Sequence, residues 1–192
     1  MTSEPINLTN HFLIAMPGLK DTLFSGAVVY LCEHNDKGAL GLVINKPIDI
    51  TLKSLFERID LSLTRDEIST LPVYYGGPVQ SERGFVLHER IGDEPTGYGS
   101  TLSIPGGLEV TTSRDVLEAL SSGAGPHRVL VTLGYSGWDA GQLEAEIGRN
   151  GWLTVQAKPE IIFDTPIEQR YEKAFTLLGF DPAQLSSVSG HA

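Results

Sequence analysis

The sequence predicts a mixed α/β fold of the α+β kind, built as a layered domain. Strand-like runs dominate the first half of the chain and alternate with helix signals in the second half. That pattern is typical of layered α/β domains rather than of sandwiches or helix bundles. The chain has 192 residues, of which 41% are hydrophobic, enough for one core of ordinary size. We therefore expect a single domain over residues 1–192, with frayed ends at 1–10 and 186–192.

Each predicted strand is a short run rich in β-branched or aromatic residues. Two runs, 27–34 and 39–46, flank the polar tip NDKG and predict a β-hairpin. The other predicted strands lie at 12–16, 73–75, 84–89, 100–104, 108–112, 128–133, 152–156 and 160–163.

The predicted helices begin at capping signals. Thr64-x-x-Glu67 has the spacing of a capping box, and Thr165-Pro166-x-Glu168 adds a proline at the first helical position. A hydroxyl residue at 112 or 113 opens a helix that Gly123 ends. Further helices are predicted after Asp139-x-x-Gln142, ending at Asn150-Gly151, and over the amphipathic segment 50–59.

Composition excludes several classes of protein. No apolar run approaches the roughly 18 residues that a membrane span needs, and the N-terminus lacks the features of a secretory signal. A single cysteine excludes an intramolecular disulfide and a multi-cysteine zinc site. The net charge of -10 repels nucleic acid and anionic lipid. We expect a cytoplasmic protein, a monomer or weak dimer, with no cofactor, no metal and no membrane contact.

The segment YLCEH carries the lone thiol, Cys32, two residues before His34. In a regular strand these two side chains share one face, so the imidazole could activate the thiol. Buried cysteine also serves as a small hydrophobic residue. Three readings stay open: a structural cysteine, a reactive or redox-sensing thiol, and a metal ligand. Cys32 and His34 are therefore weak candidates for catalytic residues.

A second segment, LGYSGWDAGQLE, reads as a strand that turns through glycines into a capped helix. Such junctions present backbone N–H groups and can hold an anion or small ligand. Ser136 stands where a nucleophile elbow places its serine, but Trp138 replaces the final glycine of G-x-S-x-G. The alternative is a packing junction around Trp138.

Two further stretches could bind a ligand or resemble a DNA-binding motif. The turn YGGPV precedes the segment SERGFVLHE. This segment contains Arg83, which could bind an anion or form a surface ion pair, and His88, a core histidine or a ligand. Residues 50–70 have the outline of a helix–turn–helix. Its second helix would present Arg65, Asp66 and Glu67 to DNA. A recognition helix with two acidic side chains among these three residues is poorly suited to bind the major groove.

Together these stretches resemble the AlgH/YqgE family of bacterial proteins. The matching segments are FLIAMP, VVYLCEH, GALGLVINKP, YGGPV with RGFVLH, TTSRDVLEAL, LGYSGWDAGQLEAEI with NGWL, and EIIF. They cover most of the chain from residue 12 to about 164, and the C-terminal helix also fits. One departure is Tyr171, where the family pattern has tryptophan, which affects local packing only.

The resemblance implies a cytoplasmic protein whose coiled, branching mixed sheet is flanked by helices. It implies no established activity and no catalytic residues, although the family carries the label of transcriptional regulator. We expect a non-enzymatic regulatory or binding protein that acts indirectly, through a protein partner or small ligand; the alternative is redox or catalytic chemistry at Cys32. The candidate surface combines family-pattern positions with Ser136 of the junction: Asn45, Gly76, Gly77, Arg83, His88, Asp115, Ser136, Gly137, Trp138 and Gln142.

Overall fold

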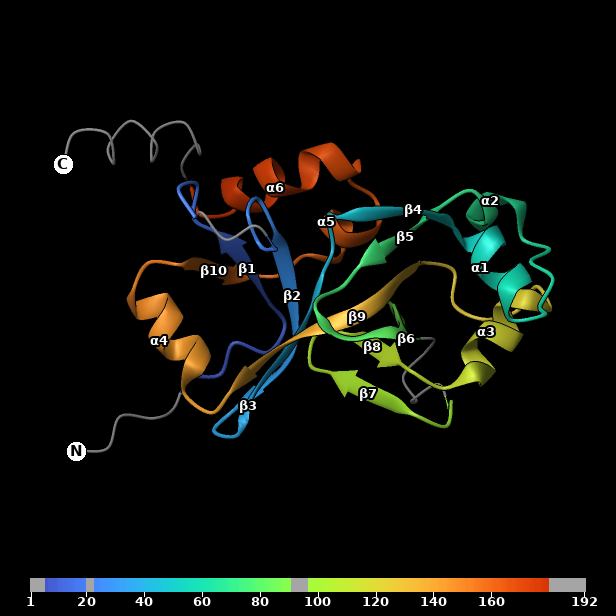
Figure 1. Cartoon of the computed structure of the whole chain (residues 1–192), viewed down its shortest axis with the longest axis horizontal. Helices are drawn as coiled ribbons and strands as arrows, with labels where there is room; N and C mark the ends of the chain where they lie inside the picture. Colours follow the sequence, from blue (N-terminus) through green and yellow to red (C-terminus); the bar gives the residue numbers. More distant parts are fainter. Residues whose placement is uncertain (1–5, 20–22, 91–96, 180–192) are drawn as a thin grey trace. The chain divides into compact units, whose positions relative to one another are not determined.

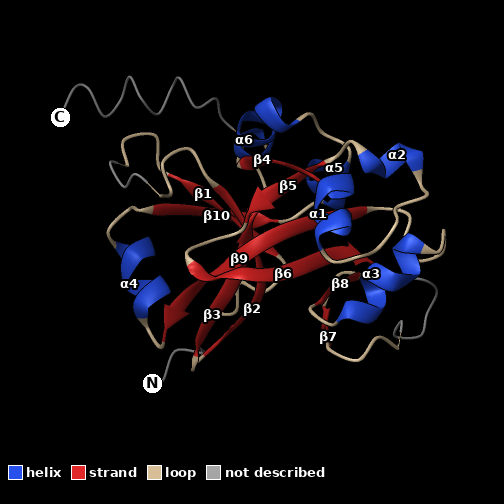
Figure 2. Ribbon diagram, turned by 45° about the vertical axis from the view of Figure 1, so that its right-hand side comes forward, coloured by secondary structure: helices blue, strands red, loops and turns tan. Residues whose placement is uncertain are grey.

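The computed structural model describes residues 6–19, 23–90 and 97–179, which form ten strands and six helices (Figure 1). These elements fall into two compact units. The terminal unit comprises Met1–Asn45 and Ser136–Ala192, and the central unit comprises Lys46–Tyr135. Strand β9 (Val129–Asp139) begins in the central unit and ends in the terminal unit. Figure 2 shows strands and short helices in both units.

The terminal unit is an antiparallel sheet in the order β10-β1-β2-β3-β9. Helix α4 lies next to β10 and β3, and α6 lies against β1 and β2. On one face, a core of aliphatic residues packs with Trp138, Leu143 and Trp152. The elements of this unit are β1 (His11–Ala15), β2 (Val28–Asn35), β3 (Gly38–Val43), β10 (Trp152–Gln156), α4 (Gln142–Gly148), α5 (Pro159–Phe163) and α6 (Ile167–Thr176).

The central unit has its strands in the order β4-β5-β9-β6-β8-β7, in which only β5 and β9 are parallel. Its core packs aliphatic strand residues against Phe56 of α1 and Leu120 of α3. The elements are β4 (Pro47–Thr51), β5 (Pro72–Tyr75), β6 (Val79–Glu89), β7 (Thr101–Ile104), β8 (Leu108–Thr111), α1 (Leu52–Arg58), α2 (Asp66–Ser69) and α3 (Arg114–Ser121).

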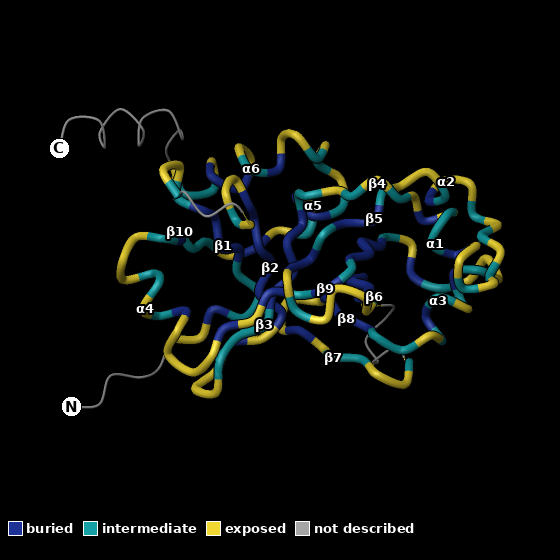
Figure 3. Tube along the Cα trace, in the orientation of Figure 1, coloured by how far each residue is buried: buried dark blue, intermediate teal, exposed yellow. Residues whose placement is uncertain are grey.

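The predicted hairpin is confirmed, with one irregularity. Strands β2 and β3 pair antiparallel around the tip, with Asn35 opposite Gly38. The register shifts between Leu31 and Glu33, so Cys32 is an extra residue in a β-bulge. Five successive residues of β2, from Val28 to Cys32, are buried in a layer that Figure 3 draws in dark blue.

Two predictions of local structure are wrong. Residues 160–163 form helix α5 rather than a strand, because Pro159 opens the helix and the Thr165 hydroxyl donates to the Glu160 carbonyl near its end. Strand β9 does not turn after Leu133 but continues to Asp139, so Ser136, Gly137 and Trp138 are strand residues. The expected junction of glycines and a helix N-terminus is therefore absent from residues 134–138.

The helix signals give the right elements with different caps. Thr51 caps α1, its hydroxyl accepting from the Ser54 N–H (3.2 Å). Thr64 donates to the Ser121 carbonyl, and α2, which begins two residues later, is only four residues long. At α4, one of the two hydrogen bonds of the expected capping box is present: the Asp139 N–H donates to the Gln142 side chain (3.0 Å).

The chain ends were expected to fray over 1–10 and 186–192. Residues 1–5 and 186–192 lie outside the described residues, and the remaining N-terminal residues contact β2. The Asn10 N–H donates to the Leu31 carbonyl, and Leu8 is buried. In the described part of the chain, no helix combines the length and apolar character required to cross a bilayer.

Candidate binding site

Cys32 sits in the bulge of β2 and is 1% exposed. Its Sγ donates weakly to the Tyr30 carbonyl (3.8 Å). Desolvation by burial, and secondarily the negative charge of Glu33, raise the pKa of the Cys32 thiol. A thiol that keeps its proton and meets no solvent is a poor nucleophile and a poor metal ligand.

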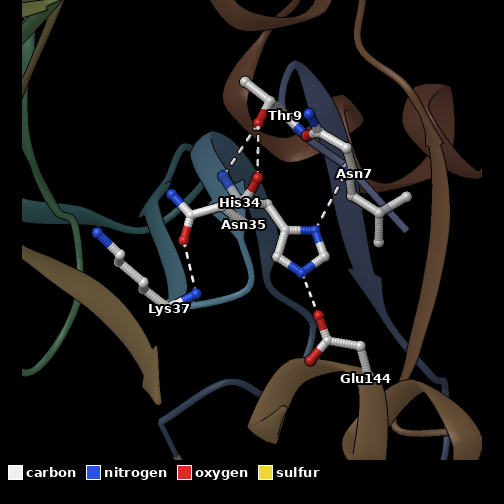
Figure 4. A network of polar contacts seen from close by, with 7 residues as sticks. Asn7, Thr9, His34, Asn35, Lys37 and Glu144 are labelled. Carbon is white, nitrogen blue, oxygen red and sulfur yellow. Dashed lines mark hydrogen bonds and ion pairs between the residues drawn. The ribbon is translucent and has the colours of Figure 1, made fainter. Parts of the chain in front are cut away.

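His34 lies at the centre of a polar network that joins three segments of the terminal unit (Figure 4). The Leu8 backbone N–H donates to Nδ1 of His34 (3.0 Å), and Nε2 contacts the Glu144 carboxylate of α4. The His34 backbone N–H donates to the Thr9 hydroxyl (3.0 Å). The network thus ties the segment before β1, the end of β2 and helix α4 together.

This geometry fixes the tautomer of His34. Nδ1 accepts a hydrogen bond, so the ring proton is on Nε2, which donates to Glu144. Desolvation raises the pKa of Glu144, but hydrogen bonds from its own backbone and from His34 outweigh it and lower that pKa overall. Both ring nitrogens are occupied, so neither is available to accept a proton from Cys32.

The bulge also separates the two catalytic candidates. Val29 and Leu31 pack in the core beside Leu143 of α4, and His34 reaches Glu144 of the same helix. Strict alternation would have put His34 opposite that face, with Cys32. The expected sharing of one face by Cys32 and His34 is therefore wrong, because one extra residue reverses the alternation.

The candidates near Trp138 form a packing cluster. The indole N–H groups of Trp138 and Trp152 both donate to Oε1 of Glu146 (3.1 and 3.0 Å), and Gln142 donates to its Oε2 (2.9 Å). Phe24 stacks on Trp138 at 6.4 Å between ring centroids. This arrangement supports the reading of a packing junction and brings Trp138 and Gln142 together through Glu146.

The other candidates of the terminal unit support the backbone. The Asn45 side chain accepts from the Val28 N–H and donates to the Gly26 carbonyl, each at 2.9 Å, so it closes the turn before β2. Ser136 is fully buried in β9 opposite Gly41, and Gly137 lies opposite Leu40. The Ser136 side chain is therefore enclosed in the sheet, and Gly137, which is exposed, presents only its backbone.

In the central unit, the most unusual feature is a polar loop inside strand β6, which we call the β6 loop (residues 78–83). Val79 pairs with Tyr135 and Gly84 with Leu133, so residues 80–83 oppose the single residue Gly134. Residues 80–83 are exposed, and Figure 3 draws them in yellow. Gln80 has a φ of 47°, a strained value for a residue with a side chain.

Three glycines make room for the β6 loop. A Cβ on Gly134 would lie 2.4 Å from the Gly77 carbonyl oxygen, and one on Gly76 would lie 2.2 Å from the Gly134 oxygen. Gly134 also has a φ of 79°, which favours glycine. Gly76, Gly77 and Gly134 therefore allow backbone segments to approach closely at the base of the β6 loop.

Arg83 braces the β6 loop. Its guanidinium donates to the Gln80 side chain (3.3 Å) and to the Thr112 hydroxyl (3.1 Å), and lies 6.0 Å from the centre of the Phe85 ring. These partners are neutral, so the contacts fix the loop against the end of β8 rather than neutralise the charge. An open hollow of about 620 Å³ is lined by Pro78, Gln80, Ser81, Glu82 and Arg83.

In the central unit, His88 is a buried residue and Asp115 a partly exposed one, and both make hydrogen bonds to neighbouring residues. His88 is fully buried, and its Nε2 lies 2.8 Å from the Thr111 hydroxyl. Burial lowers the pKa of His88, so the ring stays neutral at physiological pH. The Asp115 carboxylate accepts from the Gly99 N–H and the Ser113 hydroxyl, and that hydroxyl, followed by the Gly99 N–H, lowers its pKa.

The His88 contacts support the reading of a core histidine, and those of Asp115 tie the residue 99 turn to α3. Among residues 6–19, 23–90 and 97–179, no three His, Cys, Asp or Glu side chains gather in a way that could hold a metal ion.

The family model AlgH-like matches residues 12–183. The chain belongs to the AlgH-like family. A UPF0301 protein of Ralstonia nicotianae is 65% identical over 98% of this chain and 97% of its own length. One of Paracidovorax citrulli is 58% identical over 99% and 98%.

Solved structures confirm the AlgH-like fold. The solution structure of the AlgH protein from Pseudomonas aeruginosa has a TM-score of 0.77 and 45% identity, covering 97% of this chain and 96% of that one. A Corynebacterium diphtheriae protein, 17% identical over 92% of this chain and 88% of its own, has a TM-score of 0.71 and so shares the fold alone. The mixed α/β class and the family expected from the sequence are confirmed; the family is one of uncharacterised function.

Sequence reasoning on this AlgH-like chain missed the acidic partners. Glu144 and Glu146 lie in the segment assigned to α4, and their spacing puts them on different sides of the helix, towards His34 and towards the two tryptophans. The contact of Glu144 with His34 joins residues 110 positions apart, and Glu146 bonds to tryptophans of two strands that flank the helix, so the helix pattern alone gave neither contact. Glu82 and Gly84 were missed too, because the predicted strand begins at Gly84, whereas β6 begins at Val79 and contains both residues.

Proposed function

We propose that this AlgH-like protein is a non-enzymatic binding protein with a regulatory role, and that the β6 loop is its binding site. The observation that carries the proposal is the loop itself: four exposed residues, 80–83, opposite the single residue Gly134. A core strand gains nothing in stability from such an insertion, and strained backbone clusters at ligand sites. Arg83 holds the loop in one shape, which lowers the entropy cost of binding.

The chemistry of the terminal unit favours binding over catalysis. Cys32 is buried with a raised pKa, and His34 uses both ring nitrogens in hydrogen bonds. The alternative of a redox or catalytic thiol would require β2 to open before a reagent could reach Cys32. This cost makes the thiol the weaker of the two candidate functions.

Regulation through a partner or small ligand fits better than direct contact with DNA. The net charge is -10, and α2 is four residues long with Asp66 and Glu67 in its first turn. A recognition helix needs several basic or polar residues facing the groove. We place the protein in the cytoplasm, as a monomer or weak dimer that acts indirectly on gene expression.

Capture from a cell extract on immobilised protein tests the proposal. Proteins and metabolites bound by the wild type should be retained about tenfold less by Gly134→Ala, whose added Cβ must displace the β6 loop. Gly26→Ala is the matched control, since Gly26 has a similar φ of 70° but nothing within 4 Å of its Cβ. Arg83→Ala, an exposed change that leaves the strands intact, should show the same loss as Gly134→Ala.

Circular dichroism of each variant confirms that it is folded before capture. A wild-type set of bound molecules that Gly134→Ala and Arg83→Ala retain in full would overturn the β6 loop as the binding site.

A further inference from the structure

Next to the β6 loop, the central unit contains a half-enclosed apolar pocket of about 120 Å³. Its walls come from α1, α3, β6 and β9, which Figure 2 shows next to one another. The apolar wall residues are Leu55, Ile59, Val86, Leu117, Val131 and Leu133. It is also lined by Glu82 of the loop, by Thr111 at the end of β8, and by Thr112 and Ser113, which follow that strand.

Gly84 is the reason that the pocket exists. Residues two apart in a strand share a face, so Gly84 faces the same side as Val86. Their partners on β9, Leu133 and Val131, line the pocket as well. A Cβ built on Gly84 meets nothing within 4 Å, and its φ is not in the left-handed region. A side chain would fit without strain, and its absence leaves a space above the sheet.

The size of the pocket sets the size of its occupant. At about 120 Å³, the pocket is large enough for a short branched alkyl group. Apolar walls favour carbon over water in that space. An occupant that fits is therefore a short branched alkyl group, such as isobutyl.

The charge beside the pocket sets the head group. Glu82 lines both this pocket and the open hollow of the β6 loop, and it is exposed. Within the described part of the chain, no basic side chain forms an ion pair with Glu82. Arg83 does not line the pocket, and its guanidinium reaches Thr112 and Phe85 instead. An ammonium at the mouth of the pocket would meet the Glu82 carboxylate.

We propose that this pocket binds a short branched aliphatic group that carries an ammonium group, with Gly84 leaving the space and Glu82 contacting the ammonium. The inference rests on the proposed function and deepens it by naming the ligand class of the β6 loop. The same chemistry occurs in a free aliphatic amine and in an aliphatic side chain beside a basic group of a partner protein.

Titration with 3-methylbutylamine and 3-methylbutanoate, followed by amide chemical shifts, tests the proposal. Both probes carry an isobutyl group and differ in head-group charge. We expect the amine to bind in the millimolar range, with saturable shifts at residues 82–86 and 111–117, and the acid several-fold more weakly. Gly84→Val should weaken amine binding at least tenfold, whereas Gly148→Val, at another glycine with an open Cβ position, should not change it.

Glu82→Gln should abolish the preference for the amine, and Glu118→Gln, an exposed acid of α3, should keep it. Displacement of a captured protein by the amine identifies a partner side chain as the natural occupant; amine binding without displacement identifies a free amine. The inference is overturned if the acid binds as tightly as the amine, if Gly84→Val leaves binding unchanged, or if no saturable shift occurs. Capture that depends on Gly134 but not on Gly84 would leave the proposed function standing and reject this ligand class.

Discussion

At the scale of single residues, the chemistry of the YLCEH segment is decided by its neighbours and not by its composition. A thiol two residues from an imidazole meets the spacing for an activated pair, yet Cys32 is buried and His34 is bonded to Leu8 and Glu144. The bulge at Cys32 depends on how β2 pairs with β3, and the contact of His34 with α4 depends on Glu144, 110 positions away in the chain. The sequence therefore identifies the residue types of the YLCEH segment but not which side chains are in contact with one another.

Cys32 should react slowly with iodoacetamide in the folded protein. From pH 6 to 9 we expect a rate at least about tenfold below that of the unfolded chain, with no midpoint at or below about 8.5, because burial stabilises the protonated thiol. The rate of alkylation against pH, measured by mass spectrometry, checks this. Cys32→Ala with Ser62→Cys, at an exposed position, provides a thiol of ordinary reactivity. A fast reaction with a low midpoint in the native protein would restore thiol chemistry as the leading function.

At the scale of elements, most strands and helices were predictable, and the exceptions have physical causes. Hydrophobic alternation and turn residues located β1, β2 and β10 within one residue, and placed the hairpin, although its predicted second strand (39–46) runs past the end of β3 at Val43. The apolar run at 160–163 fits a strand or a buried helix equally well, and Pro159 decides for the helix. The length of β9 was underestimated because its glycines read as a turn, whereas Gly134 instead faces the β6 loop.

Helix α4 is held to the sheet by Glu146, which accepts from two buried indoles. Glu146→Ala leaves both N–H groups without this acceptor, so we expect the free energy of unfolding to fall by about 2–4 kcal/mol. Glu146→Gln keeps an acceptor oxygen and should cost about 1 kcal/mol. Urea unfolding followed by tryptophan fluorescence checks both values. Glu118→Ala, in an exposed ion pair with Arg114, is the control and should change stability by less than about 0.5 kcal/mol. Equal losses in all three variants would contradict a specific role for Glu146.

At the scale of the whole molecule, the fold class and the family followed from the sequence, but the site did not. The candidate surface of ten residues divides equally between the two units, and most of its members support the backbone or the core. Only Gly76, Gly77 and Arg83 converge on one feature, the β6 loop. The pocket beside it depends on the missing side chain of Gly84 and on packing between α1, α3 and β9, which no sequence pattern specifies.

The position of the binding site is the central claim, and hydrogen–deuterium exchange tests it most directly. A soluble cell extract is passed over the immobilised protein, and the bound molecules are eluted. Hydrogen exchange of the wild-type protein is then measured in buffer alone and in buffer that contains this eluate. We predict slower exchange at residues 78–86 and 111–117, because a bound ligand or partner covers the β6 loop and the Gly84 pocket. Protection confined to residues 28–35 and 142–148, around Cys32 and His34, would contradict the account and move the site to the terminal unit.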